Sequence, residues 1–327
     1  MLDFINRPVF ICGHPKSGTS LLTALLDGHP YLVVYPEETL FFRRFLPAIE
    51  GKAFEDQWRL AQQMLIHIFE WNQENPPAHQ KNFPDRDYSN ISFDEIRRLM
   101  QAIVPKTETE PRDFLEAAIL AFKDATDLEH ENPKHWVEKS PYNEFYADKI
   151  INWWSKSKCI HIVRDPRDNF ISYKRKHPDW TSRKFAWNWN LSTQAGLNNH
   201  EKYGADRYLL LRYEDLLLRK NFITQRITEF LSIPWDEKLL FPSRLGVLWQ
   251  GNSMFEEDYN EISLNPIGRW KYLINEYDLA MIQAICKNMM YRMNYELVEE
   301  KFSTLSTHQK ITLLFEKSKI ILKSLLN

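Results

Sequence analysis

Cysteine is scarce in this chain: Cys12, Cys159 and Cys286 are the only three among 327 residues. They lie far apart in the sequence, and two of them fall in apolar, strand-like runs, where a free cysteine behaves as a small hydrophobic side chain. The chain therefore gives no indication of a disulfide framework, and we expect a reducing compartment. No hydrophobic secretory segment precedes the first predicted strand, which begins near Val9, so we predict a cytoplasmic location.

Long hydrophobic runs, strong net charge and internal repeats are absent as well. No apolar stretch reaches the roughly 20 residues of a membrane-spanning helix, so we predict no transmembrane segment. The 42 basic and 44 acidic side chains leave a net charge of −2, which argues against a nucleic-acid partner held by a broad basic surface. The composition instead offers 43% hydrophobic and 14% aromatic residues, enough for one large α/β domain or two small ones with a ring-rich core.

The most informative stretch follows the first predicted strand. Residues 9–12 form an apolar run typical of a buried strand, residues 13–20 form a turn, and an apolar helical pattern begins at Leu21. Free backbone N–H groups at the start of such a helix converge on one point, and the helix dipole favours an anion there. The turn adds one cation and three hydroxyls, from Lys16, Ser17, Thr19 and Ser20. We therefore predict a phosphate-binding loop.

The glycines of this turn have the spacing of a nucleotide P-loop. Gly13 and Gly18 allow a tight turn and let the backbone approach a ligand closely. A P-loop kinase or ATPase continues with Lys and then Ser or Thr, whereas this chain continues with Thr19 and Ser20. Its lysine, Lys16, lies two places before the second glycine, which suggests an anionic nucleotide bound without a metal. A tight turn that binds no ligand is the alternative interpretation.

Further apolar runs predict four more strands, at residues 32–35, 135–138, 158–163 and 208–211. Helical patterns separate them, so we predict an α/β fold: a P-loop-type parallel sheet of about five strands with helices on both faces. Residues 43–133 predict a helical insertion or lid, and residues 242–267 predict irregular structure. We expect a single domain over residues 1–300 and an amphipathic C-terminal helix over residues 301–327, which could pack on the domain, form a homodimer contact or touch a membrane surface.

A second anion-binding element is predicted after the fourth strand, at Arg164. Asp165 can cap the helix that follows. On that helix, Ser172 lies two turns beyond Arg164, and Lys176 lies one turn further on roughly the same face. Arg164, Ser172 and Lys176 could together hold one anion. A solvated basic patch is the alternative, since Lys176 ends a run of three basic residues.

Charged residues stand just past four of the predicted strands: Lys16, Glu38, Lys139 and Arg164. Because the ligands of parallel sheets collect at the carboxyl ends of the strands, we expect these residues to surround one active site. Glu37 directly precedes Glu38. The sequence leaves open which of the two points into the site, and whether both are instead first-turn acids of a helix.

Several motifs in a fixed order resemble the sulfotransferase superfamily. They comprise residues 15–20, 26–30, 37–39, 162–168 with Ser172, 212–216 and 268–271. Within this superfamily the chain looks most like bacterial sulfotransferases similar to tyrosylprotein sulfotransferases, over roughly residues 8–296. The resemblance implies an enzyme that moves the sulfuryl group of 3′-phosphoadenosine-5′-phosphosulfate to an acceptor hydroxyl or amine, with no metal ion.

The resemblance also implies how the sulfate donor is held. The loop binds the 5′-phosphosulfate through Lys16, Ser17, Gly18, Thr19 and Ser20. Arg164, Ser172 and Lys176 bind the 3′-phosphate. Tyr213 contacts the adenine side, and Arg269 closes over the nucleotide.

For catalysis, the resemblance assigns Glu38 as the general base and Lys139 as a support for the group in transfer. Sulfuryl transfer, like phosphoryl transfer, depends mainly on positioning and charge stabilisation. Lys16, Lys139 and the loop N–H groups can stabilise the charge that builds on the bridging oxygen, and a carboxylate can take the proton of the acceptor. A P-loop kinase or NTPase and a catalytically inactive nucleotide-binding module are the alternatives. The acceptor is left open among small molecules, carbohydrates and peptides.

Overall fold

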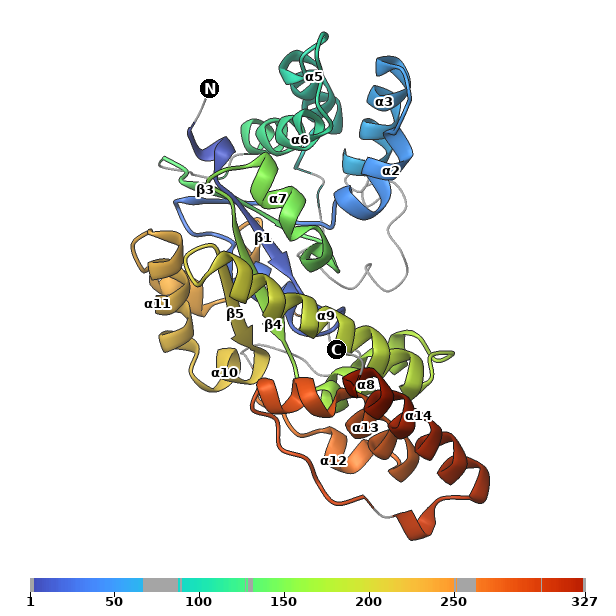
Figure 1. The fold of residues 1–327 in the computed structure, drawn as a ribbon. Coiled ribbons are helices and arrows are strands. Elements are labelled where there is room, and N and C mark those ends of the chain that lie inside the picture. The colour runs from blue at the N-terminus through green and yellow to red at the C-terminus, as the bar shows by residue number, and fades with distance from the viewer. Residues whose placement is uncertain are drawn as a thin grey trace.

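The computed structural model describes residues 3–66, 88, 90–126, 128, 132–249, 251, 263–300 and 302–325. Its centre is a five-stranded sheet, which comprises β1 (Pro8–Cys12), β2 (Leu32–Val34), β3 (His135–Lys139), β4 (Lys158–Val163) and β5 (Tyr208–Arg212). All neighbouring strands pair in parallel, in the order β2-β3-β1-β4-β5 (Figure 1). The predicted parallel sheet is confirmed, and each of the five predicted strands is present.

The strand register brings the carboxyl ends of the strands to one edge of the sheet. Ile11 of β1 pairs with Lys139 of β3, and Val163 of β4 pairs with Arg212 of β5. The segments that carry the predicted site residues therefore leave the sheet at the same edge. Both faces of a parallel sheet are normally covered, which explains why these strands are continuous apolar runs rather than alternating ones.

Helices cover both faces of the sheet, as predicted. Side chains alternate along each strand, so Phe10 and Trp136 lie on one face, whereas Val9 and Val137 lie on the other. The first face packs against α5 (Phe93–Ile103), α6 (Pro111–Ala125) and α7 (Ala147–Trp153). The second face packs against α1 (Thr19–Leu26), α10 (Tyr213–Leu218) and α11 (Lys220–Leu231).

A third apolar cluster lies beyond the edge of the sheet. It joins α8 (Pro166–Lys176), α9 (Ser182–Tyr203), α13 (Glu276–Arg292) and α14 (Thr307–Leu325) (Figure 1). On α14, Leu313 and Glu316 are buried against this cluster, and Glu316 pairs with Arg183 of α9 at 2.8 Å. Three large apolar side chains of α14 are instead more than half exposed: Ile311, Leu314 and Phe315. The division into residues 1–300 and 301–327 stays a prediction.

The described part of the predicted insertion is mostly helical, and turns and irregular segments such as residues 104–110 join its helices. It contains α2 (Leu46–Ile49), α3 (Phe54–Ala61), α5 and α6, with the π-helical segments η2 (Phe41–Phe45) at its start and η3 (Gln62–Ile66) after α3. The start of α8 follows the prediction, because the side chain of Asp165 accepts a hydrogen bond from Arg167 N at 2.9 Å. Short helices complete the described chain: η1 (Asp3–Asn6), η5 (Asn143–Tyr146), η6 (Glu237–Leu240), α12 (Trp270–Leu273) and η7 (Phe302–Thr304).

The prediction of irregular structure over residues 242–267 was wrong in part. β6 (Ser243–Arg244) and β7 (Val247–Leu248) form an antiparallel hairpin. Its turn consists of Leu245 and Gly246, whose φ angles of 51° and 74° suit a tight two-residue hairpin turn. The usual sequence signal for such a turn is Asn-Gly or Asp-Gly, so leucine at the first position concealed it. Residues 250 and 252–262 lie outside the described part of the chain.

In the residue ranges that the structure describes, no helix combines the length and the apolarity that crossing a bilayer requires.

Candidate active site

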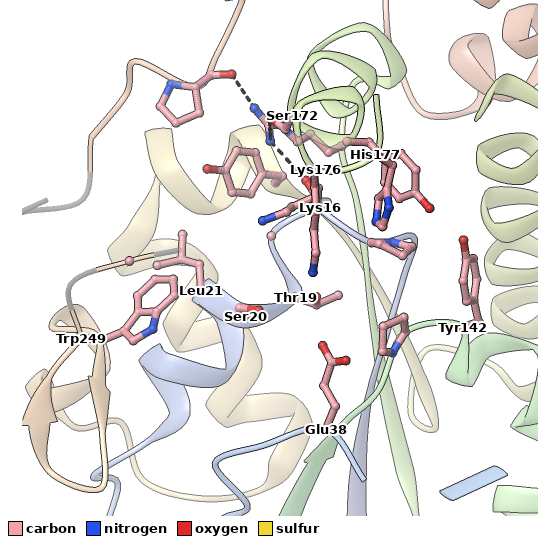
Figure 2. A pocket seen from close by; sticks show the side chains of 18 of the residues that line it. Lys16, Thr19, Ser20, Leu21, Glu38, Tyr142, Ser172, Lys176, His177 and Trp249 are labelled. Atoms are coloured by element: carbon pink, nitrogen blue, oxygen red, sulfur yellow. Dashed lines mark hydrogen bonds between the residues drawn. The ribbon is translucent and has the colours of Figure 1, made fainter. Parts of the chain in front are cut away.

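A cavity of about 530 Å³ opens at the carboxyl edge of the sheet (Figure 2). Ten of the twelve predicted site residues line it: Lys16, Gly18, Thr19, Ser20, Glu38, Arg164, Ser172, Lys176, Tyr213 and Arg269. The other two are Ser17, whose buried side chain turns toward Gly13, and Lys139, which is buried beside Glu38. The fold therefore gathers residues from distant parts of the sequence around one space, and their individual roles stay predictions.

The loop before α1 has a backbone suited to an anion. Gly13, Lys16 and Gly18 have positive φ angles of 139°, 67° and 103°. Gly18 is the N-cap of α1 and has no side chain with which to cap it. The first N–H groups of α1 therefore keep their hydrogen-bonding capacity for a ligand, at the end of the helix where an anion is favoured.

Glycine at position 18 also lets Tyr213 reach the loop. A Cβ at this position would lie 2.3 Å from Cδ2 of Tyr213, far closer than a Cβ approaches a nonbonded atom. Tyr213 is the first residue of α10, directly after β5, and its ring centroid lies 4.7 Å from the guanidinium carbon of Arg164. The end of β5 thus contacts both predicted anion-binding elements.

Arg164 connects these elements through hydrogen bonds. Its Nη1 donates to the carbonyl oxygen of Lys16 and to Oγ of Ser172, each at 3.2 Å. Its Nη2 donates to the carbonyl oxygen of Pro266 at 2.8 Å. Arg164 is only 5% exposed. Three segments therefore meet at one buried cation: the predicted phosphate loop at residues 13–20, α8 and the chain before Gly268.

Positive charge accumulates around Lys16. Burial, and after it the nearby cations Lys176 and Lys139, lower the pKa of Lys16 to about 8, against the opposite effect of Glu38. Figure 2 shows Glu38 on one side of the cavity and Lys16 with Lys176 on the other. Among the described lining residues there are six lysine and arginine side chains and a single carboxylate, so the cavity suits a polyanion.

The two adjacent glutamates have different surroundings. Glu38 lines the cavity, keeps 40% of its side chain exposed, and places Oε1 2.5 Å from Nζ of Lys139. Glu37 accepts hydrogen bonds from the hydroxyl of Tyr88 at 2.6 Å and from Nη1 of Arg244 at 3.0 Å. Both glutamates precede η2, so their interpretation as first-turn acids of a helix was wrong. The geometry directs Glu38, rather than Glu37, into the cavity.

Arg269 is held at the cavity by a residue that sequence reasoning did not select. Asp168 of α8 accepts hydrogen bonds from Gly268 N at 2.7 Å and from Trp270 N at 2.8 Å, on either side of Arg269. Arg167 adds a contact, with its guanidinium carbon 4.0 Å from the ring centroid of Trp270. In the sequence, Asp168 is only the last residue of the motif at residues 162–168, because no local pattern reveals contacts with residues 100 positions away.

Other lining residues were also missed. One side of the cavity has Leu21 and Trp249, which lie near each other in Figure 2. Further aromatic and basic side chains line the cavity: Arg43, Arg44, Tyr142, Tyr173, His177 and Trp180. The adjacent arginines just after Glu38 were the available signal, but they fell in the segment interpreted as a lid. Among the described residues, no group of three or more His, Cys, Asp or Glu side chains could hold a metal ion.

Comparison with known protein families gives a match over most of the chain. The family described as "Sulfotransferase family" matches residues 8–237. Protein-tyrosine sulfotransferase A of Caenorhabditis elegans is 26% identical over 308 residues, which cover 90% of this chain and 69% of that protein. The protein-tyrosine sulfotransferase of Drosophila melanogaster is 24% identical over 239 residues, which cover 71% of this chain and 39% of that protein. The chain thus spans only part of the length of these relatives.

Solved structures agree with the observed fold. The sulfotransferase domain from the Synechococcus PCC 7002 olefin synthase has a TM-score of 0.52 and 21% identity, and the match covers 89% of this chain and 96% of that chain. The sulfotransferase domain from the curacin biosynthetic pathway has a TM-score of 0.50 at the same identity. The two structures support the fold, and the family match over residues 8–237 confirms the resemblance that the motifs indicated.

Proposed function

Because this chain belongs to the sulfotransferase family, we propose that it transfers the sulfuryl group of 3′-phosphoadenosine-5′-phosphosulfate to an acceptor hydroxyl by in-line displacement. The observation that carries this proposal is the cavity, in which a half-exposed carboxylate, Glu38, lies across from Lys16 within a ring of cations. A polyanionic nucleotide fits such a space, and a carboxylate opposite it can act on an acceptor.

The proposed donor site has two anion-binding ends. The phosphate loop, with Lys16 and the first N–H groups of α1, would hold the 5′-phosphosulfate. Arg164, Ser172 and Lys176 would hold the 3′-phosphate, supported by the existing bond from Arg164 Nη1 to Ser172 Oγ. Tyr213 lies between these ends and offers a ring face near the nucleoside, and Arg269 would close over it.

The proposed chemistry assigns one task to each side chain around the reacting sulfur. The bound donor supplies a sulfuryl group on a nucleotide leaving group. Glu38 accepts the proton of the acceptor hydroxyl. Lys16 and the loop N–H groups stabilise the charge that develops on the bridging oxygen. Lys139 orients Glu38 through their 2.5 Å ion pair and lies near enough to share in that stabilisation.

Calorimetry with 3′,5′-ADP, the desulfated donor, tests the nucleotide site. We expect binding without Mg²⁺, and about 10- to 100-fold weaker binding of 5′-AMP, because it leaves the charged partners of the 3′-phosphate unused. Arg164→Ala should abolish this preference, whereas Arg183→Ala, which alters an arginine on α9 paired with Glu316, should preserve it. Binding of ATP only with Mg²⁺ would instead favour a P-loop kinase or NTPase.

Transfer of a labelled sulfuryl group tests the reaction. A panel of tyrosine peptides, phenols, sugars and lipid alcohols is appropriate, and tyrosine peptides come first because two relatives are named protein-tyrosine sulfotransferases. A chain that binds 3′,5′-ADP but transfers no label to any acceptor would support the inactive-module alternative. A cytoplasmic location and a homodimer contact through the C-terminal helix stay proposals alongside the acceptor class.

A further inference from the structure

Glu138, the next-to-last residue of β3, is a buried carboxylate. It is 1% exposed, and no lysine or arginine of the described chain forms an ion pair with it. Burial raises the pKa of Glu138, while the hydrogen bonds from Ser140, Thr39 and Asn143 lower it. Burying a carboxylate costs free energy unless hydrogen bonds replace its hydration, so the burial of Glu138 depends on its hydrogen-bond donors.

Those donors come from two segments of the chain. Oε1 of Glu138 accepts from Thr39 Oγ1 at 2.7 Å, from Thr39 N at 3.4 Å and from Ser140 Oγ at 2.5 Å. Oε2 accepts from Asn143 Nδ2 at 2.8 Å. Every contact uses the carboxylate as an acceptor, which is the pattern that an ionised group satisfies.

The hydroxyls of Thr39 and Ser140 link this carboxylate to two further backbone N–H groups. Leu40 N donates to Ser140 Oγ at 2.9 Å, and Phe41 N donates to Thr39 Oγ1 at 3.2 Å. Each hydroxyl accepts from a backbone N–H and donates to Glu138. The N–H groups of residues 39, 40 and 41 are therefore hydrogen-bonded to the carboxylate of Glu138, either directly or through one hydroxyl.

These three N–H groups belong to the strained turn that follows Glu38. Leu40 has a left-handed backbone, with φ 50°, and it leads into the π-helical segment η2. Such a conformation is unfavourable for leucine, and the first N–H groups of a helix need partners. An anion at this end supplies both the partners and a favourable charge.

The turn sets the direction in which Glu38 points. Lys139, the neighbour of Glu138, pairs with the cavity residue Glu38, whereas Glu138 accepts hydrogen bonds from Thr39 behind it. The last two residues of β3 thus hold the Glu38 segment from both sides. We infer that Glu138, with Thr39 and Ser140 as relays, is a positioning residue that fixes the proposed base, Glu38, in the cavity; this rests on the proposed function.

Glu138→Gln tests the inference because glutamine keeps the shape but directs an NH₂ group at existing donors. Residue-resolved hydrogen–deuterium exchange should show the amides of residues 39–41 exchanging at least about tenfold faster. Turnover with labelled donor and p-nitrophenol should fall about 10- to 100-fold in kcat, as expected for a misplaced base. The donor KM and the 3′,5′-ADP affinity should stay within about threefold, a split that general destabilisation would not produce.

Matched variants separate this role from simple burial. Glu116→Gln alters a partly buried carboxylate on α6, which accepts a hydrogen bond from the indole of Trp154, and should leave exchange at residues 39–41 and turnover unchanged. Ser140→Ala, which removes the relay for Leu40 alone, should accelerate exchange chiefly at that amide. Glu138→Asp keeps the charge and should restore part of the turnover lost in Glu138→Gln.

The outcomes distinguish this inference from the proposed function. Unchanged exchange at residues 39–41 in folded Glu138→Gln and Ser140→Ala overturns the inference, even where sulfuryl transfer is established. Should Glu138→Gln fail to fold, Ser140→Ala and Thr39→Val decide the same point. If the unaltered chain neither binds 3′,5′-ADP nor transfers label, the proposed function fails, while the exchange data still report whether Glu138 holds the turn.

Discussion

At the scale of single residues, two pairs of adjacent side chains differ in their roles: Glu37 with Glu38, and Glu138 with Lys139. Glu37 and Glu138 accept hydrogen bonds from neighbouring segments, whereas Glu38 lines the cavity and Lys139 pairs with it. Adjacent residues on an extended backbone point in opposite directions, so one member of each pair can hold the fold while the other faces a ligand. Substitutions within one pair should therefore have different consequences.

Glu38→Gln should lower kcat about 100-fold or more and leave the 3′,5′-ADP affinity within about threefold, because it removes only the proton acceptor. Steady-state kinetics and calorimetry on one preparation measure both quantities. Glu37→Gln serves as the control, and it should lower thermal stability through its buried partners Tyr88 and Arg244. The opposite result, with turnover lost only in Glu37→Gln, would show that Glu37 rather than Glu38 is the base.

The affinity for 3′,5′-ADP should weaken as the pH rises through about 8, since burial and neighbouring cations lower the pKa of Lys16 to about 8. At pH 9 only about a tenth of Lys16 would carry charge, which corresponds to roughly tenfold weaker binding than at pH 7. The unfolded lysine stays protonated to higher pH, so this residue makes the unliganded protein more stable as the pH rises through 8.

Lys16→Arg provides the control for this pH dependence, because arginine keeps its charge throughout the range. Calorimetry at pH 7 and pH 9 should give a nearly constant dissociation constant for this variant. An equal pH dependence in both proteins would show that Lys16 does not contact the nucleotide.

Gly18→Ala should weaken 3′,5′-ADP binding at least about tenfold, because the new methyl group would meet the ring of Tyr213 and displace it or the loop. Gly51→Ala is a matched control, since Gly51 also has a positive φ but nothing within 4 Å of the added Cβ. It should cost only about 1–2 kcal/mol of stability from backbone strain and leave the affinity unchanged. Equal effects on affinity would contradict close packing of Tyr213 on the loop.

At the scale of elements, α8 connects the predicted 3′-phosphate site with the segment that carries Arg269. Ser172 and Lys176 face the cavity, while Asp168 holds residues 268–270 against the same helix. Arg164 adds a bond to the carbonyl oxygen of Pro266. A helix thus serves both as a binding surface and as an anchor for the chain that borders the cavity.

Asp168→Asn should weaken 3′,5′-ADP binding about tenfold, mainly through faster dissociation, because its NH₂ group opposes one of the two backbone donors. Stopped-flow measurement of dissociation tests this expectation. The double variant with Arg269→Ala should lose little more than Arg269→Ala alone, because both changes affect one contact. Fully additive losses would separate Asp168 from Arg269.

At the scale of the whole molecule, the C-terminal helix α14 packs against the outer helical cluster. α14 buries Leu313 and Glu316 against α9 and α13, and it contributes no described residue to the cavity lining. Its exposed side chains Ile311, Leu314 and Phe315 lie away from that contact. The C-terminal helix therefore supports the fold at a distance from the proposed chemistry.

A chain that ends at residue 306 should bind 3′,5′-ADP within about threefold of the full chain but unfold several degrees lower, since it loses the packing around Leu313. Differential scanning calorimetry and nucleotide titration measure the two effects. Leu313→Ala in the full chain should reproduce part of the lower unfolding temperature. Loss of nucleotide binding in the shortened chain would show that the helix supports the cavity directly.

Local sequence patterns were sufficient for the central sheet of this protein. Apolar runs located all five of its strands, and the glycine spacing with Lys16 located the turn before α1, because strand burial and tight turns are decided by residues that are near neighbours in the chain. The hairpin at residues 243–248 escaped this reasoning, since its turn uses leucine where the common signal is asparagine or aspartate.

Only the tertiary structure decided which side chains share the cavity. Glu38 and Lys139 are 101 positions apart, and Asp168 and Gly268 are 100 apart, so no local pattern could relate them. Their contacts depend on the strand order and register, which place separate chain segments at one edge of the sheet. The sequence by itself determined the five strands of the parallel sheet and the loop that we predict to bind an anion. Long-range packing directed Glu38, rather than Glu37, into the cavity and turned Glu138 toward the backbone of residues 39–41.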